Sequence, residues 1–185
     1  MKLKYKNCRG DTYFIRKIEG KKGIRYVCST KESDNDLTQL PKGFEIAENP
    51  NAKVVCRKKL QSLITKEEFI FADKLVSQLT TQDAVKLELK KKEIIIYATD
   101  PSRLMFLGMP SVNPDISSRD IFNKIAYFEA VLRFELFNLT ERSFIAYRMT
   151  WRGDCDWMML KKGKLNSLIK ELAPHIGKDS FYELF

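Results

Sequence analysis

The chain contains a single histidine, His175, and no motif that would join it to a nucleophile. His175 lies where a helix is expected to end, and an imidazole there interacts favourably with the helix dipole without any catalytic role. No Gly-x-Ser-x-Gly elbow, Walker A loop or dinucleotide-binding glycine pattern occurs in the sequence. These absences favour a binding protein over an enzyme, and we predict no bound cofactor.

Cysteine is sparse and contains no close pair. Of the four cysteines, Cys8 and Cys28 are separated by 19 residues, and Cys28 and Cys56 by 27 residues. Structural zinc sites bring their ligands in close pairs that one tight turn can direct at the ion. Cysteines this far apart, two of them in expected strands, are typical of small packed side chains. We therefore predict reduced thiols and no metal site.

Long apolar runs are also absent. No uncharged stretch approaches the roughly 20 residues that cross a bilayer as a helix. The basic start of the chain is not followed by the apolar segment of a signal peptide. The composition, 44% apolar and 31% charged, is typical of an ordered globular chain. We predict a cytoplasmic protein with no membrane span.

Positive charge is abundant and unevenly distributed. Residues 1–64 contain 15 Lys and Arg against seven Asp and Glu, a net charge of +8. Residues 65–185 contain the other 18 cations against 17 acids, a net charge of +1. Almost the whole net charge of +9 therefore lies in the first third of the chain. A local field of this sign attracts phosphates and other anions.

The basic first third has the pattern of short strands joined by tight turns. Residues 12–18 and 24–30 are rich in β-branched and aromatic side chains and flank a glycine-bounded turn. Residues 44–47 and 54–56 flank Asn49-Pro50-Asn51, which is a turn sequence. The polar residues 31–42 are expected to form a loop. Two hairpins are therefore predicted here.

Two helices are predicted in the rest of the chain. Thr65 and Glu68 have the spacing of a capping box, and an apolar stripe at helical spacing continues to residue 79. A second apolar stripe over residues 164–173 ends before Pro174. We expect the apolar C-terminal residues 181–185 to dock on the sheet rather than form a free tail.

Several strands are predicted around these helices. Residues 85–89 alternate between apolar and charged side chains, and residues 94–97 return after a lysine turn. After a helical turn near residues 118–124, three further strands over 128–136, 143–152 and 157–160 form an antiparallel meander. Phe128, Ala130, Leu132, Phe134 and Leu136 are expected on one face. In the next strand Ile145, Tyr147, Met149 and Trp151 form the apolar phase.

These elements predict an α+β fold, a mostly antiparallel sheet with two amphipathic helices, preceded by a small basic β-hairpin module. We place the basic β-rich module at residues 1–62 and the α+β domain at residues 63–185. Four or five short strands provide a marginal core, so the module is expected to rest on the remainder of the chain.

The leading functional hypothesis is a non-enzymatic protein whose basic module binds DNA or RNA through backbone charge, with little sequence specificity. Tyr13, Phe14 and Tyr26 are interleaved with the cations and are candidates for stacking on bases, although they are equally suited to the core of the module. The candidate contact residues are Lys17, Lys21, Lys22, Arg25, Lys53, Arg57 and Lys58.

Two alternatives belong to other classes of protein. In the first, the α+β domain holds an apolar small molecule between its sheet and helices, closed by a lid over residues 101–114 that contains Leu104, Met105 and Phe106. Alternatively, the chain is a protein-interaction or assembly factor that uses an exposed apolar surface. A basic surface without a nucleic-acid partner would instead suit an acidic protein.

Overall fold

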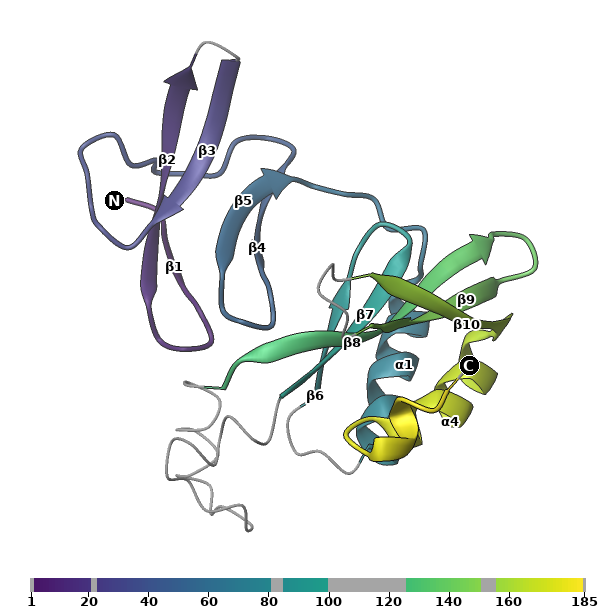
Figure 1. The fold of residues 1–185 in the computed structure, drawn as a ribbon. Coiled ribbons are helices and arrows are strands. Elements are labelled where there is room, and N and C mark those ends of the chain that lie inside the picture. Colours follow the sequence, from purple (N-terminus) through teal and green to yellow (C-terminus); the bar gives the residue numbers. More distant parts are fainter. Residues whose placement is uncertain (1, 21–22, 81–84, 100–125, 151–155, 185) are drawn as a thin grey trace, which may run out of the picture. The chain divides into compact units, whose positions relative to one another are not determined.

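The structure is a computed structural model that describes residues 2–20, 23–80, 85–99, 126–150 and 156–184 (Figure 1). The helices are α1 (Lys66–Leu79) and α4 (Leu165–Leu172), followed by the short 3-10 turns η1 (Ala173–His175) and η2 (Asp179–Phe181). The strands are β1 (Lys4–Lys6), β2 (Thr12–Gly20), β3 (Gly23–Ser29), β4 (Phe44–Glu48), β5 (Val54–Lys58), β6 (Val85–Leu89), β7 (Glu93–Thr99), β8 (Phe128–Asn138), β9 (Ser143–Met149) and β10 (Trp157–Lys164).

The broad α+β class predicted from the sequence is confirmed. Antiparallel pairing joins the strands of three sheets, β1-β2-β3, β4-β5 and β10-β9-β8-β7-β6. The chain divides into two compact units, one of residues 1–60 with 114–126 and one of residues 61–113 with 127–185. We call these the N-terminal unit and the C-terminal unit and describe each by itself. The division into a basic module of residues 1–62 and an α+β domain of residues 63–185 stays a prediction.

Two small sheets pack together in the N-terminal unit. β2 and β3 pair from Phe14↔Ser29 to Gly20↔Gly23, and the φ of Gly23 is 105°, a left-handed conformation that suits glycine. β3 contacts β5 of the second sheet, and the rings of Tyr26 and Phe44 meet edge to face with their centroids 4.7 Å apart. The most buried apolar side chains of this unit include Phe14, Ile15, Ala52 and Val54.

The loop after β3 is anchored by a buried ion pair. Asp36 forms an isolated bridge with Arg16, and its fully buried carboxylate accepts a hydrogen bond from Arg16 Nε at 3.1 Å. The same carboxylate accepts from the backbone N–H of Ser33 at 2.6 Å. These two bonds explain how a polar stretch without a strand of its own is held against β2.

The predicted capping box begins α1. Thr65 Oγ1 accepts from the Glu68 backbone N–H at 3.2 Å, and the Glu68 carboxylate accepts from the Thr65 N–H at 2.9 Å. Ala72 and Val76 of the predicted stripe are buried in the core, and Phe69, Leu75 and Leu79 pack against it. Arg142, in the turn between β8 and β9, pairs with Glu68 and so ties the start of the helix to the sheet.

The core of the C-terminal unit lies between one face of the five-stranded sheet and the two helices, which lie on the same side of it (Figure 1). The sheet contributes alternate residues of its central strands, and Phe134, Leu132, Ile94 and Ile96 are fully buried. α4 contributes its Leu165, Leu168, Ile169 and Leu172. Phe181, in η2, belongs to the same core, so part of the C-terminal segment packs there.

A bulge in β8 changes the face on which two predicted core residues lie. Ile96 pairs with Leu132, but Tyr97 pairs with Ala130, so Val131 is an extra residue between them. Because directly opposed residues share a face and neighbours alternate, Phe128 and Ala130 lie on the face opposite to Leu132. The single apolar face expected from residue 128 to residue 136 was therefore wrong. Sequence alternation cannot reveal an inserted residue that reverses it.

The orientation of β9 also differs from what its apolar phase suggests. Phe144 and Ala146 pair with Leu136 and Phe134 and are buried beneath the helices. Ile145, Tyr147 and Met149, the more apolar phase, lie on the opposite face and are only partly buried.

Neither helix of the described part of the chain has the length and apolar character needed to cross a membrane.

Candidate nucleic-acid interface

The structure distributes the candidate cations of the N-terminal unit over different surfaces. Lys17 pairs with Tyr26, whereas Arg25 pairs with Ile18 one position along, so the two cations lie on opposite faces of the β2–β3 hairpin. Lys53 is exposed in the turn between β4 and β5, and Lys58 is exposed at the far end of β5. Lys21 and Lys22 lie outside the described residues. The described cations therefore do not form one compact cluster.

Two of the candidates are already engaged by acids. Lys17 Nζ lies 2.5 Å from Glu19 Oε1, and this hydrogen bond raises the pKa of Lys17 and lowers the pKa of Glu19. Arg57 Nε donates to Glu45 Oε1 at 2.9 Å across the β4–β5 pair. A phosphate would have to compete with these carboxylates, so Arg25, Lys53 and Lys58 are the better placed candidates.

Positive charge nevertheless remains in excess after all recorded pairing. Of the 15 Lys and Arg in residues 1–64, four form ion pairs, two lie outside the described residues, and nine form no ion pair with a described residue. Those nine are Lys4, Lys6, Arg9, Arg25, Lys31, Lys42, Lys53, Lys58 and Lys59. The surplus is spread over the whole unit, which suits attraction of a polyanion along its length rather than a single ion.

Two of the aromatic side chains interleaved with these cations contribute to packing. Phe14 is buried and has Lys4 Nζ 5.5 Å from its ring centroid, and Tyr26 packs on Phe44. Tyr13 is half-buried and pairs with Tyr5 of β1. The Tyr5 hydroxyl donates to Glu48 at 2.8 Å, and burial together with this bond raises the pKa of Tyr5 to about 12.

Aromatic and cationic side chains meet on the outer face of the C-terminal sheet, the face away from α1 and α4. Arg133 on β8 is directly opposite Tyr147 on β9, and its guanidinium carbon lies 4.3 Å from the Tyr147 ring centroid. The same carbon lies 4.8 Å from the ring centroid of Trp157 on β10. We call these three residues the arginine–aromatic cluster. These three residues were not among the candidates predicted from the sequence, although the apolar phase of residues 145–149 was a usable indication.

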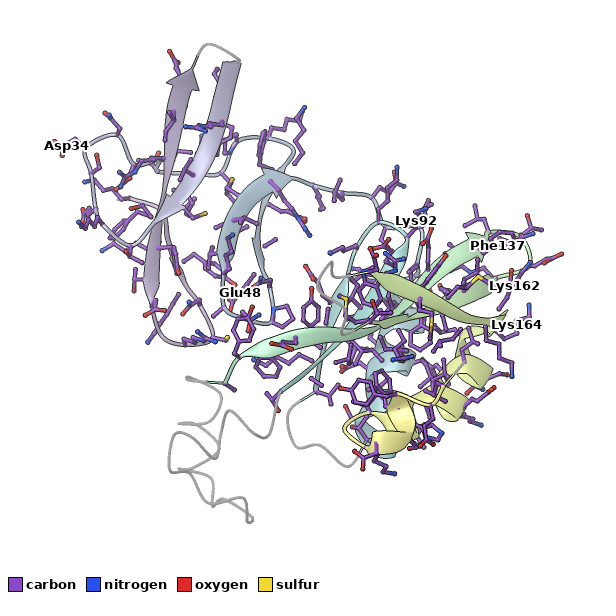
Figure 2. All side chains as sticks on the ribbon, viewed as in Figure 1. Asp34, Glu48, Lys92, Phe137, Lys162 and Lys164 are labelled. Carbon is purple, nitrogen blue, oxygen red and sulfur yellow. The ribbon has the colours of Figure 1, made fainter. Side chains whose placement is uncertain are left out.

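Figure 2 labels Lys92, Phe137, Lys162 and Lys164, which lie towards the end of the sheet where β8 ends and β9 begins. Lys162 Nζ lies 3.9 Å from the Phe137 ring centroid, and Phe137 is 58% exposed. Lys92 donates to Glu135 at 2.5 Å, a bond that raises the pKa of Lys92. Lys164 donates to the Glu141 carbonyl.

Three of the four cysteines lie within the described residues. Cys28 and Cys56 are free thiols, and Cys8 is exposed. Burial, with a smaller effect of the neighbouring Cys56, raises the pKa of Cys28 to about 11, and burial also raises the pKa of Cys56. No set of three or more potential metal ligands gathers within the part of the chain that the structure describes. The lid candidates Leu104, Met105 and Phe106 lie outside that part.

Comparison of the chain with protein-family models, with curated proteins and with solved structures gives no match.

Proposed function

We propose that this protein is a non-enzymatic nucleic-acid-binding protein that holds DNA or RNA through the charge of its N-terminal unit. The observation that carries the proposal is the surplus of cations there, nine of which form no ion pair with a described residue. Each cation that meets a phosphate releases condensed counterions, and this release makes binding favourable and strongly salt-dependent. Charge spread over several faces supports binding with little sequence specificity, because backbone contacts carry no sequence information.

A charge-reversal triple variant tests the proposal. Arg25, Lys53 and Lys58 are exposed and form no ion pair with a described residue, so replacing each with Glu removes cations without disrupting an ion pair within the described part of the chain. We expect this variant to bind a labelled oligonucleotide much more weakly at low ionic strength. The slope of log affinity against log salt should also become shallower, by roughly 2 to 3 if all three residues meet phosphates.

The matched control reverses the same amount of charge elsewhere. Lys66, Lys74 and Lys170 are exposed residues of α1 and α4, on the opposite side of the C-terminal sheet from the arginine–aromatic cluster. If both triple variants lose affinity equally, net charge alone is responsible and the N-terminal unit is not the site. If the unmodified protein shows no salt-sensitive binding to DNA or RNA at low ionic strength, the proposal is wrong, and an acidic protein becomes the preferred partner.

We also propose that residues 1–62 and 63–185 form two separate modules and that the protein is cytoplasmic. Limited proteolysis of the full chain should leave a protected fragment that runs from about residue 60 to the C-terminus, because the larger core lies there. Preferential survival of a fragment of residues 1–60 would contradict this organisation.

A further inference from the structure

The arginine–aromatic cluster is built like a surface on which flat rings can stack. Arg133, Tyr147 and Trp157 come from three consecutive strands, so the antiparallel ladder sets their spacing. The side chain of Arg133 is 19% exposed, and its guanidinium lies within 5 Å of both ring centroids. Guanidinium and aromatic side chains are planar surfaces on which another planar group can stack.

The hydrogen-bonding capacity of Arg133 is largely unused. Its Nε is buried and has no hydrogen-bond partner among the described residues. Its Nη atoms approach Glu93 and Glu135 only at 3.8 and 3.9 Å, which is longer than a hydrogen bond. Glu135 instead accepts a 2.5 Å bond from Lys92. Arg133 is therefore held by the rings, and its Nη atoms, unlike the buried Nε, retain donors for a phosphate or a base edge.

Apart from the carboxylates of Glu93 and Glu135 beside Arg133, the surroundings of the cluster supply apolar surface and an exposed lysine. Next to it on the edge strand, Met159 pairs with Tyr147 and is 62% exposed, so apolar surface continues beside the rings. One step further, Lys162 pairs with Ile145 on the same face and is exposed. Stacking surface bordered by lysine is the combination that binds unpaired nucleotides, whose bases need a planar partner and whose phosphates need a cation.

From these observations we infer that the outer face of the C-terminal sheet binds single-stranded nucleic acid by stacking of unpaired bases on Arg133, Tyr147 and Trp157. This inference rests on the proposed function and adds a preference to it: the N-terminal charge attracts any nucleic acid, and the cluster selects single strands. Duplex DNA keeps its bases stacked internally, so it gains nothing from the cluster and binds through its phosphates alone.

Binding of a labelled thymidine oligomer of about 16 nucleotides, compared with a duplex of equal length, tests the inference by fluorescence anisotropy. Tyr147→Ala and Trp157→Ala should each weaken single-strand binding roughly tenfold or more and leave duplex binding within about twofold. Tyr147→Phe and Trp157→Phe retain a ring and should retain most of the affinity. Arg133→Lys keeps the charge but loses the plane, so it should also weaken single-strand binding selectively.

Tyr182→Ala is the matched control, because Tyr182 is an aromatic residue that is 51% exposed and lies in the segment after α4, away from the outer face. It should leave binding to both probes unchanged. Unaltered single-strand affinity in the Tyr147 and Trp157 alanine variants would overturn the inference and leave the proposed function standing. Equal losses on both probes would overturn it as well, because base stacking cannot act on a duplex. Absence of binding by the unmodified protein would overturn both proposals.

Discussion

Glu68 joins two separate stabilising arrangements at the start of α1, so its replacement should cost more than an ordinary surface change. Its carboxylate accepts from the Thr65 N–H at 2.9 Å and completes the capping box. The same carboxylate accepts from Arg142 Nε at 2.8 Å and from Arg142 Nη2 in a two-point pair. Arg142 also donates to the Leu63 carbonyl at 3.1 Å. The pair therefore fastens the helix start to the β8–β9 turn.

The expected loss for Glu68→Ala can be worked out from these contacts. Loss of a helix cap costs about 1 kcal/mol. The Glu68 and Arg142 side chains are 24% and 31% exposed, so their pair is screened less than a fully exposed one and contributes about 1 kcal/mol. Glu68→Ala should therefore lower the free energy of unfolding by about 2 kcal/mol. For a chain of this size that corresponds to a fall in melting temperature of about 4–8 °C.

Chemical denaturation of four single variants and one double variant separates the two contributions. Glu68→Gln keeps an acceptor for the cap but loses the charge, so it should cost less than Glu68→Ala. Arg142→Ala removes the pair with Glu68 and the bond to the Leu63 carbonyl but leaves the cap intact. Because the φ of Arg142 is 51°, alanine retains the same backbone strain. Lys66→Ala is the control, because Lys66 is exposed in the first turn and does not contribute a side-chain bond to the cap.

The reasoning is refuted if Glu68→Ala is no more destabilising than Glu68→Gln, or if Glu68→Ala and Arg142→Ala are strictly additive in the double variant. Additivity would mean that the pair contributes no coupling energy. A loss in Lys66→Ala equal to that in Glu68→Ala would show that any substitution in the first turn has this effect.

Three further expectations follow from burial and titration. Phe134→Ala, at a fully buried position in the core, should lower the free energy of unfolding by about 3–5 kcal/mol, measured in urea, and a loss below about 1 kcal/mol would contradict the packing. Burial and the bond to Glu48 raise the pKa of Tyr5 in the folded protein to about 12. The stability that the protonated Tyr5 hydroxyl contributes is therefore complete below about pH 10 and is lost as the pH rises through 12. Tyr5→Phe should flatten the pH dependence of the melting temperature in that window. In a Cys155→Ser background at neutral pH, a thiol reagent should modify the exposed Cys8 well before Cys28, whose raised pKa leaves little thiolate, and a faster Cys28 would refute this order.

Local chemistry made several elements predictable. The capping box of Thr65 and Glu68 identifies the start of α1 because the two reciprocal bonds involve residues only three positions apart. The turn at Gly20–Gly23 and the Asn49-Pro50-Asn51 turn predicted the β2–β3 and β4–β5 pairings for the same reason. Alternation likewise predicted the strands of the C-terminal sheet, because the side chains of a strand alternate whatever its partner.

Alternation did not predict which face is buried. The extra residue Val131 reverses the phase of β8, and it is visible only in the pairing of Tyr97 with Ala130. In β9 the less apolar phase, Phe144 and Ala146, lies beneath the helices, because the register with β8 places it opposite Leu136 and Phe134. A register depends on the partner strand, so it cannot be obtained from the residues of one strand.

The candidate sites were likewise predictable from the sequence only in part. The sequence by itself determined the charge surplus of residues 1–64, because net charge depends on composition and not on folding. Only the tertiary structure decided which cations are neutralised, since Arg16 meets Asp36 from 20 residues away in the chain. The arginine–aromatic cluster likewise brings together Arg133, Tyr147 and Trp157 from three strands. Their proximity results from strand pairing across the sheet, and no spacing along the chain encodes it.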